Sequence, residues 1–216
     1  MKRQVDLSDI SDGRLYDSND MVKADCLGCK DCHKCCTGMG ESIVLDPYDV
    51  FNLMKGTGRK FEELLGDAVE MNVVDGITLP NISMKSGNCS FLKDGRCVVH
   101  QFRPGICRMF PLGRYYIEDG FKYFLQVHEC PVNNKGKIKV KKWIGYPDIS
   151  GYEKYIRCWH DFMVSLQENL SELSEDNVRV LNILVVKTFY QTVYGEDFFG
   201  EFYDRIDKIK EMLGIQ

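Results

Sequence analysis

The residues with the clearest chemical potential are ten cysteines in a chain of 216 residues. Five of them lie in one short segment, Cys26-Leu-Gly-Cys29-Lys-Asp-Cys32-His-Lys-Cys35-Cys36. Two residues between cysteines let one turn of chain aim both sulfurs at one ion, and this spacing serves zinc and iron–sulfur sites alike. Three overlapping C-x-x-C pairs that end in Cys-Cys therefore indicate metal binding rather than core packing.

The remaining cysteines are spread along the chain. Cys89 and Cys97 flank Asp94-Gly95, a dipeptide typical of hairpin turns, so a hairpin is expected to bring their sulfurs within reach of one site. Cys107 lies between Arg103-Pro104 and Phe110-Pro111, and Cys130 is followed by a proline. Cys158 stands alone in a predicted helix, where we interpret it as a small buried hydrophobic residue.

Together these features resemble the CxxCxxCC cysteine-cluster family, a domain described as chelating zinc or iron, to which the cysteine region of bacterial flagellin lysine N-methylases is related. The motif falls on Cys29, Cys32, Cys35 and Cys36. The family pattern continues with a cysteine before a Phe-Leu pair, here Cys89, and a second after a turn, here Cys97. The signature Arg-Pro-x-x-Cys-Arg-x-Phe-Pro is complete at Arg103, Pro104, Cys107, Arg108, Phe110 and Pro111. The resemblance covers residues 26–131 and implies metal binding, with Cys26 outside the motif.

Eight cysteines are accordingly the expected metal ligands: Cys29, Cys32, Cys35, Cys36, Cys89, Cys97, Cys107 and Cys130. Both zinc and iron–sulfur cubanes accept four thiolates, so eight fit two sites. The C-x-x-C-x-x-C run with a remote Cys-Pro is similar to the bacterial ferredoxin pattern, whereas structural zinc modules more often use two separated knuckles. We therefore prefer an iron–sulfur cluster (4Fe–4S), with zinc as the alternative.

Adjacent side chains leave the backbone in different directions, so Cys35 and Cys36 need not serve one centre. One hypothesis groups Cys29, Cys32 and Cys35 with Cys130, and groups Cys36, Cys89 and Cys97 with Cys107. Three histidines close to the cysteines in sequence could replace a thiolate, although satisfied or exposed histidines are the simpler interpretation: His33, His100 and His128. The guanidinium groups of Arg103 and Arg108 could offset the negative charge of four thiolates, or form ordinary surface ion pairs.

Charge and composition exclude some classes of protein. The chain has 28 Lys and Arg against 32 Asp and Glu, a net charge of −4, and so lacks the basic surplus of most nucleic-acid binders. We expect no nucleic-acid partner and no membrane association, since the longest apolar run, residues 183–186, is far too short to span a bilayer. The N-terminal residues contain no apolar stretch typical of a signal peptide. A cytoplasmic location follows, in which thiols stay reduced and clustered cysteines usually bind metal.

Three functions fit this pattern. The preferred one is a metal-binding protein whose centre is structural, transfers electrons to an unidentified protein or redox partner, or senses. The second, by analogy with the lysine N-methylases, is methyl transfer from S-adenosylmethionine to a protein lysine. No G-x-G-x-x-G motif follows a predicted strand. The C-x-x-x-C-x-x-C spacing of radical enzymes that use S-adenosylmethionine is also absent, because Cys32 and Cys36 have the first spacing but position 39, where the third cysteine would lie, is Met39. The third is a storage or chaperone protein that binds metal reversibly. Whether the chain is an enzyme stays open.

The elements that must position the cysteines indicate an α+β fold. We expect a polar arm at residues 1–25, a metal-binding domain of small hairpins and short helices at 26–148, and a layer of three helices at 149–216. Hairpins are predicted by three Asp-Gly pairs: Asp75-Gly76, Asp94-Gly95 and Asp119-Gly120.

Predicted elements in the cysteine domain are a strand at 43–45, a helix opened by Asp46-Pro47 and stopped at Gly56 and Gly58, a helix at 59–65 and an edge strand at 137–143. Predicted C-terminal helices run from a Ser150/Glu153 capping box to Leu170, from Ser174 to Gly195, and from Phe198 to Leu213.

Overall fold

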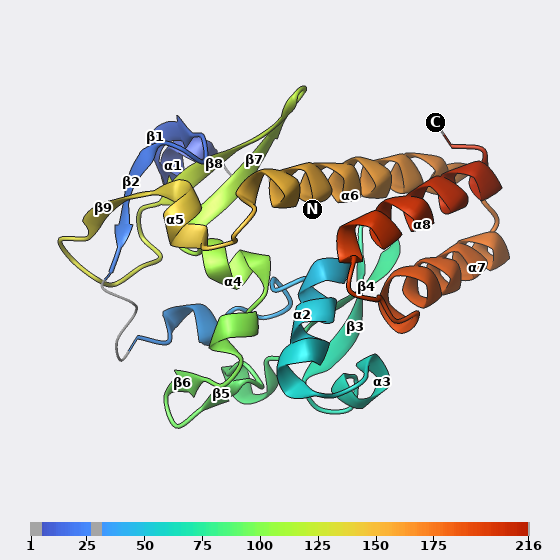
Figure 1. Ribbon diagram of the computed structural model, residues 1–216, viewed down its shortest axis with the longest axis horizontal. Helices are drawn as coiled ribbons and strands as arrows, with labels where there is room; N and C mark the ends of the chain where they lie inside the picture. Colours follow the sequence, from blue (N-terminus) through green and yellow to red (C-terminus); the bar gives the residue numbers. More distant parts are fainter. Residues whose placement is uncertain (1–5, 27–31, 216) are drawn as a thin grey trace.

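The computed structural model describes residues 6–26 and 32–215, and it confirms the α+β class. Strands gather in small antiparallel groups: a three-stranded sheet in the order β1-β8-β7, and the pairs β2-β9, β3-β4 and β5-β6. Short helices α2 to α5 lie among these strands, and three long helices, α6 to α8, complete the molecule (Figure 1). The expectation of small hairpins followed by a layer of three helices is therefore correct.

The first described residues form regular structure where the sequence predicted a polar arm. After the single turn α1 (Leu7–Ile10), strand β1 (Ser11–Tyr16) pairs with β8 (Gly120–Gln126), and β2 (Met21–Asp25) pairs with β9 (Gly136–Lys139). The prediction of a loop is wrong here because Val22 and Ala24 alternate with polar residues and are buried, while the charged side chains face outward. This segment is thus part of the sheet structure.

All three predicted Asp-Gly hairpins are confirmed. They join β3 (Val69–Val74) to β4 (Ile77–Ile82), β5 (Leu92–Lys93) to β6 (Arg96–Cys97), and β7 (Leu112–Ile117) to β8. In the first turn both Asp75 and Gly76 have positive φ, 48° and 86°, as a type I′ hairpin turn requires. Residues 43–45 extend the β3-β4 pair, since Leu45 donates to the carbonyl of Pro80 and Ile82 donates to that of Ile43.

Helix α2 (Pro47–Thr57) begins and ends as predicted. Asp46 is its N-cap in a capping box with Asp49, and Gly58 closes it in the left-handed conformation. Helix α3 (Phe61–Leu64) follows. The predicted edge strand at 137–143 is only half correct, because residues from Val140 form the short helix α5 (Val140–Ile144). Val140 and Ile144, four positions apart, both face the core, a spacing that suits a helix rather than a strand.

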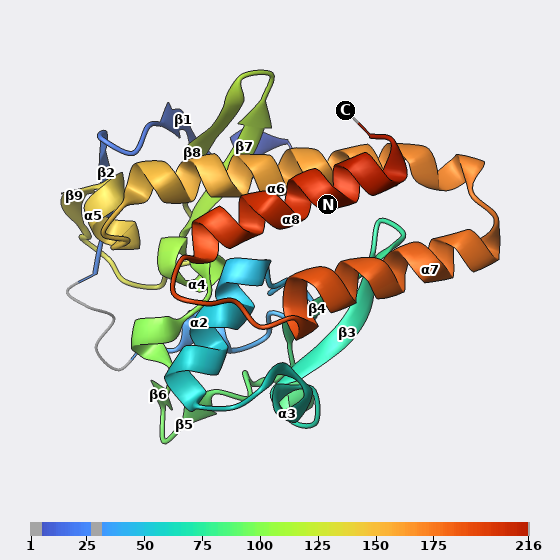
Figure 2. The same ribbon diagram turned by 45° about the vertical axis from the view of Figure 1, so that its right-hand side comes forward.

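The C-terminal helices are α6 (Ile149–Asn169), α7 (Glu175–Val186) and α8 (Phe198–Leu213). The turn η4 (Leu170–Glu172) follows α6, and a π-turn, η5 (Lys187–Gln191), ends the α7 segment before the predicted Gly195. Asp148 caps α6 by accepting from Gly151, so the predicted cap at Ser150 is wrong, whereas Ser174 caps α7 as predicted. In both views α6 and α8 lie side by side (Figure 2).

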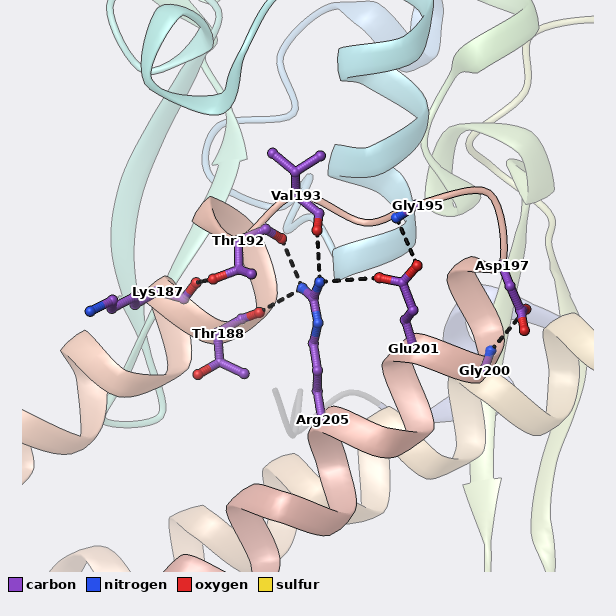
Figure 3. A network of polar contacts seen from close by, with 9 residues as sticks. All are labelled: Lys187, Thr188, Thr192, Val193, Gly195, Asp197, Gly200, Glu201 and Arg205. Atoms are coloured by element: carbon purple, nitrogen blue, oxygen red, sulfur yellow. Dashed lines mark hydrogen bonds and ion pairs between the residues drawn. The ribbon is translucent and has the colours of Figure 1, made fainter.

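The loop between α7 and α8 is held by one arginine. Arg205 of α8 donates to the carbonyls of Thr188, Thr192 and Val193, each at 2.8 Å, and pairs with Glu201 at 3.4 Å (Figure 3). Glu201 in turn accepts from the backbone N–H of Gly195. This network fixes the chain between the two helices.

The largest hydrophobic cluster joins the cysteine half to the C-terminal helices. It contains Leu53 of α2 and Ile77 of β4 together with Phe162 of α6, Val185 of α7 and Phe202 of α8. The predicted boundary near residue 148 therefore coincides with no break in the buried core, and the division into domains stays a prediction. In residues 6–26 and 32–215, no helix is both long enough and apolar enough to cross a bilayer.

Candidate metal centre

Backbone pairing places Cys36 beside Cys89. The turn η1 (Lys34–Cys36) carries Cys35 and Cys36, and the Cys36 carbonyl accepts from the N–H of Cys89 at 2.8 Å. A bridge between Thr37 and Asn88 continues this pairing up to the turn η2 (Lys85–Gly87). Two cysteines 53 positions apart, 89 − 36, are thereby neighbours.

The β5-β6 hairpin brings Cys97 to the same place. Cys97 pairs with Leu92 across the hairpin, and the N–H of Val98 donates to the carbonyl of Phe91 at 2.9 Å. The expectation that the Asp94-Gly95 turn gathers Cys89 and Cys97 is borne out, because both line one cavity. In Figure 1 this hairpin, the 32–36 segment and α4 lie toward the same end of the molecule.

Cys107 reaches the cavity from helix α4 (Gly105–Met109), which follows the turn η3 (His100–Phe102). Arg108 ties the two elements together by donating from Nε to the carbonyl of Arg103 at 3.1 Å and from Nη2 to that of Gln101. Trp143 of α5 donates to the carbonyls of Met109 and Phe110 at the end of α4. The Arg-Pro-x-x-Cys-Arg signature thus builds a short, braced helix that carries one thiol.

The cavity has a volume of about 280 Å³, and six of its lining residues are cysteines: Cys32, Cys35, Cys36, Cys89, Cys97 and Cys107. The Sγ atoms of Cys35 and Cys36 are 3.9 Å apart. Three arginines and two histidines also line the cavity, namely Arg96, Arg103, Arg108, His33 and His100. Thiols with cationic neighbours form a donor set suited to a soft, thiolate-bound metal or cluster.

The thiols differ strongly in acidity. Hydrogen bonding with the Cys36 thiol lowers the pKa values of Cys35 and Cys97 to about 7, helped by the positive charge of Arg103, and it also lowers the pKa of Cys89. The same interactions raise the pKa of Cys36, which keeps the proton that its neighbours share. Desolvation raises the pKa of Cys107 well above its usual range. A bound cation would replace the shared proton, since metal ligation requires thiolates.

Not every predicted ligand lies at this cavity. Cys29 falls outside the described residues, and Cys130 is not among the lining residues. The hypothesis that separated Cys35 from Cys36 does not match this arrangement, because the two sulfurs are adjacent and face the same space as Cys89 and Cys97. Of the three histidines, His33 and His100 line the cavity and His128 does not. Desolvation and two neighbouring arginines lower the pKa of His100, so its imidazole is neutral at pH 7.

The described thiols line a cavity and are not already arranged around the position of a single ion. Within residues 6–26 and 32–215, no three His, Cys, Asp or Glu side chains are gathered in the arrangement of a ready-made ion site. All nine cysteines of the described residues are free thiols. The ligand assignments therefore stay a prediction.

Sequence reasoning missed the buried polar residues behind the cavity. Asp49 of α2 accepts from the N–H of Gly105 at 2.7 Å, and Arg114 of β7 donates to the hydroxyl of Tyr152 at 2.7 Å. Tyr155 donates to Asp46 at 3.0 Å and accepts from the N–H of Tyr48. The Asp46-Pro47 pair was a visible signal for a helix start, but no local pattern identifies contacts with α4 and α6.

Short helices and hairpins thus bring six thiols to one cavity with basic neighbours. This arrangement is that of a cysteine-cluster protein. In agreement, residues 28–131 match the model of the CxxCxxCC family, whose description is "Putative zinc- or iron-chelating domain". This assignment supports metal binding and covers zinc and iron alike. Comparison with curated proteins and with solved structures yielded no match.

Proposed function

We propose that the chain holds an iron–sulfur cluster in the six-cysteine cavity, in a structural, electron-transfer or sensing role. Cys35, Cys36, Cys89 and Cys97 are the proposed principal ligands, because their thiols interact with one another. Cys32 and Cys107 line the same space and could replace one of them. The observation that carries the proposal is a cavity of about 280 Å³ enclosed by more thiols than one ion can use.

The size of the cavity favours a cluster over a single ion. Four thiolates around one zinc lie about 2.3 Å from it, which places neighbouring sulfurs about 3.8 Å apart and leaves no space between them. A cubane with four cysteine ligands fills a larger volume. Basic residues at the cavity, Arg103 above all, would offset the excess negative charge of such a cluster and raise its reduction potential.

Structural zinc is the second candidate, and one distance favours it. The 3.9 Å between the sulfurs of Cys35 and Cys36 is close to the edge of a zinc–thiolate tetrahedron. In that case four thiolates would bind the ion and the metal would stabilise the fold; they would come from Cys35, Cys36, Cys89 and Cys97. Either metal suits a compartment in which thiols are reduced, and the free cysteines support the cytoplasm as that compartment.

Metal analysis of protein purified without oxygen tests the proposal. A cubane predicts about four irons and four sulfides per chain with broad visible absorption from thiolate-to-iron charge transfer. One zinc and no colour would establish the second candidate, and neither metal would refute both. Cys97→Ser should lose most of the metal, whereas the matched variant Cys158→Ser, which changes a cysteine of α6 outside the cavity lining, should retain it.

A further inference from the structure

Helix α4 is short and has no capping side chain of its own. The residue before it, Pro104, makes no side-chain cap bond, and the first N–H groups of a helix have no partner inside it. The N–H of Gly105 instead donates to Oδ1 of Asp49, in a buried bond between residues 56 positions apart. Because Cys107 follows two residues later, this bond fixes the end of α4 that carries the thiol.

Asp49 uses its two carboxylate oxygens for two different helices. Oδ2 accepts from the backbone N–H of Asp46 at 3.3 Å, which completes the capping box of α2. In a common capping box this is the whole task of the residue at the third position. Here Oδ1 crosses to α4 as well, and the side chain is buried, with Asp49 only 2% exposed. The buried side chain of Asp49 thus links the start of α2 to the start of α4.

A second contact confines the same stretch of backbone. A Cβ added at Gly105 would collide with the hydroxyl of Tyr152, so that only glycine fits. Arg114 holds that hydroxyl by donating to it at 2.7 Å, and its positive charge partly offsets the desolvation that raises the pKa values of Asp46 and Asp49. Residues from α2, β7 and α6 therefore meet at one glycine, two positions before Cys107.

We propose that Asp49 is a positioning residue of the metal centre, which places α4 and thereby sets the Cys107 thiol against the cavity. The inference rests on the proposed function, in that Cys107 matters only if the cavity holds metal. Asp49 bonds to the backbone of Gly105 rather than to a thiol. Desolvation is the main cause of the raised pKa of the Cys107 thiol, and the negative charge of Asp49 also helps to raise it.

The test is Asp49→Asn in the full chain. An amide has the shape of the carboxylate, but one of its two ends donates, so either Asp46 or Gly105 loses its acceptor. The matched control is Asp197→Asn, because Asp197 also accepts from a glycine N–H at a helix start, that of Gly200 in α8, which is outside the cavity lining. The measurement is alkylation of each cysteine by iodoacetamide, quantified by mass spectrometry, in anaerobically purified protein and after chelation.

We expect alkylation of Cys107 to be about tenfold faster in Asp49→Asn, as the loss of one buried hydrogen bond implies. Cys36 and Cys89 should keep their wild-type rates, and the control should match wild type at every thiol. An unchanged rate at Cys107 would overturn the inference. Equal acceleration of all thiols would also overturn it, since Asp49 would then merely support the fold.

A second pair of variants keeps the charge of Asp49, and so decides the matter if Asp49→Asn does not fold or if it changes Cys107 only through the pKa of the thiol. Gly105→Ala should displace α4 and accelerate alkylation of Cys107, and adding Tyr152→Phe should restore protection by removing the colliding hydroxyl. Failure of this rescue would contradict the positioning role. Absence of zinc and iron from wild-type protein would refute the proposed function, but the rates at Cys107 in that metal-free protein would still decide the role of Asp49.

Discussion

Arg205 offers a direct measure of how firmly the C-terminal helices are joined to the cysteine half. Its side chain is only 13% exposed, its guanidinium carbon lies 3.6 Å from the ring centroid of Tyr194, and it holds three backbone carbonyls (Figure 3). Tyr194 packs against Phe198 at 4.4 Å and Phe51 at 6.3 Å between ring centroids. Phe51 belongs to α2, so the effect of Arg205 should extend into the cysteine half.

The expected cost of Arg205→Ala follows from these contacts. A hydrogen bond to a charged group contributes about 1.5–3 kcal/mol, and a cation–π contact about 0.5–2 kcal/mol. The carbonyls of Thr192 and Val193 lie in an exposed loop, where water can replace part of the loss. We therefore expect the free energy of unfolding to fall by about 3 kcal/mol, or the melting temperature by about 6–12 °C for a chain of this size.

Urea unfolding should be followed by two probes, far-UV circular dichroism for the helices and pulsed alkylation of Cys89 for the cysteine half. If the shared core makes the chain one cooperative unit, both midpoints shift together in Arg205→Ala. Arg179→Ala is the control, because Arg179 is 72% exposed in its pair with Asp176 and should change stability by less than about 0.5 kcal/mol. A loss below about 1 kcal/mol, or a shift confined to circular dichroism, would refute the reasoning.

Three further predictions concern the metal and its support. Removing the metal with a chelator should lower the free energy of unfolding. The loss should be about 4 kcal/mol if the concentration of free metal was about a thousand times its Kd before chelation. An unchanged melting temperature would count against a metal that supports the fold. In metal-free protein, Cys35 and Cys97 should react with iodoacetamide at half-maximal rate near pH 7, because the thiolate is the nucleophile and their pKa values are lowered to about 7. Reaction should slow below that pH; a midpoint near pH 9 would contradict the hydrogen bonding from Cys36. Tyr155→Phe should lower the free energy of unfolding by about 2 kcal/mol in chemical denaturation, since the half-buried N–H of Tyr48 loses its acceptor, and a neutral result would show that water replaces the hydroxyl.

The features that sequence predicted correctly depend on few neighbouring residues. Asp75-Gly76 sets a hairpin because its two residues adopt positive φ, and Asp46, Ser174 and Gly58 act on the helix turn beside them. The grouping of Cys89 with Cys97 followed from a turn in the same way. Such signals are local, so they are readable without knowledge of the rest of the molecule.

The features that sequence missed depend on partners far along the chain. Residues 11–25 looked like a polar arm because their acidic side chains dominate the composition, yet β1 pairs with β8 more than a hundred positions later. Asp148 and Ser150 are both good cap residues, and only the direction of the incoming chain selects Asp148. Likewise, the spacing of Cys35 and Cys36 could not reveal that both sulfurs face one cavity, because the pairing with Cys89 determines it.

The contacts behind the cavity bear on the role of the C-terminal helices. Tyr155 of α6 bonds to the start of α2, and Tyr190, which follows α7, donates to the carbonyl of Leu45 at 3.0 Å. From the start of α2, Asp49 reaches Gly105, two positions before Cys107. Each link is buried or half-buried and would leave an unpaired polar group if one side were absent, which costs more than the bond itself contributes. The cysteine domain is therefore packed against the C-terminal helices, which bond to the start of α2 and so support indirectly, through Asp49 and Gly105, the helix that carries Cys107.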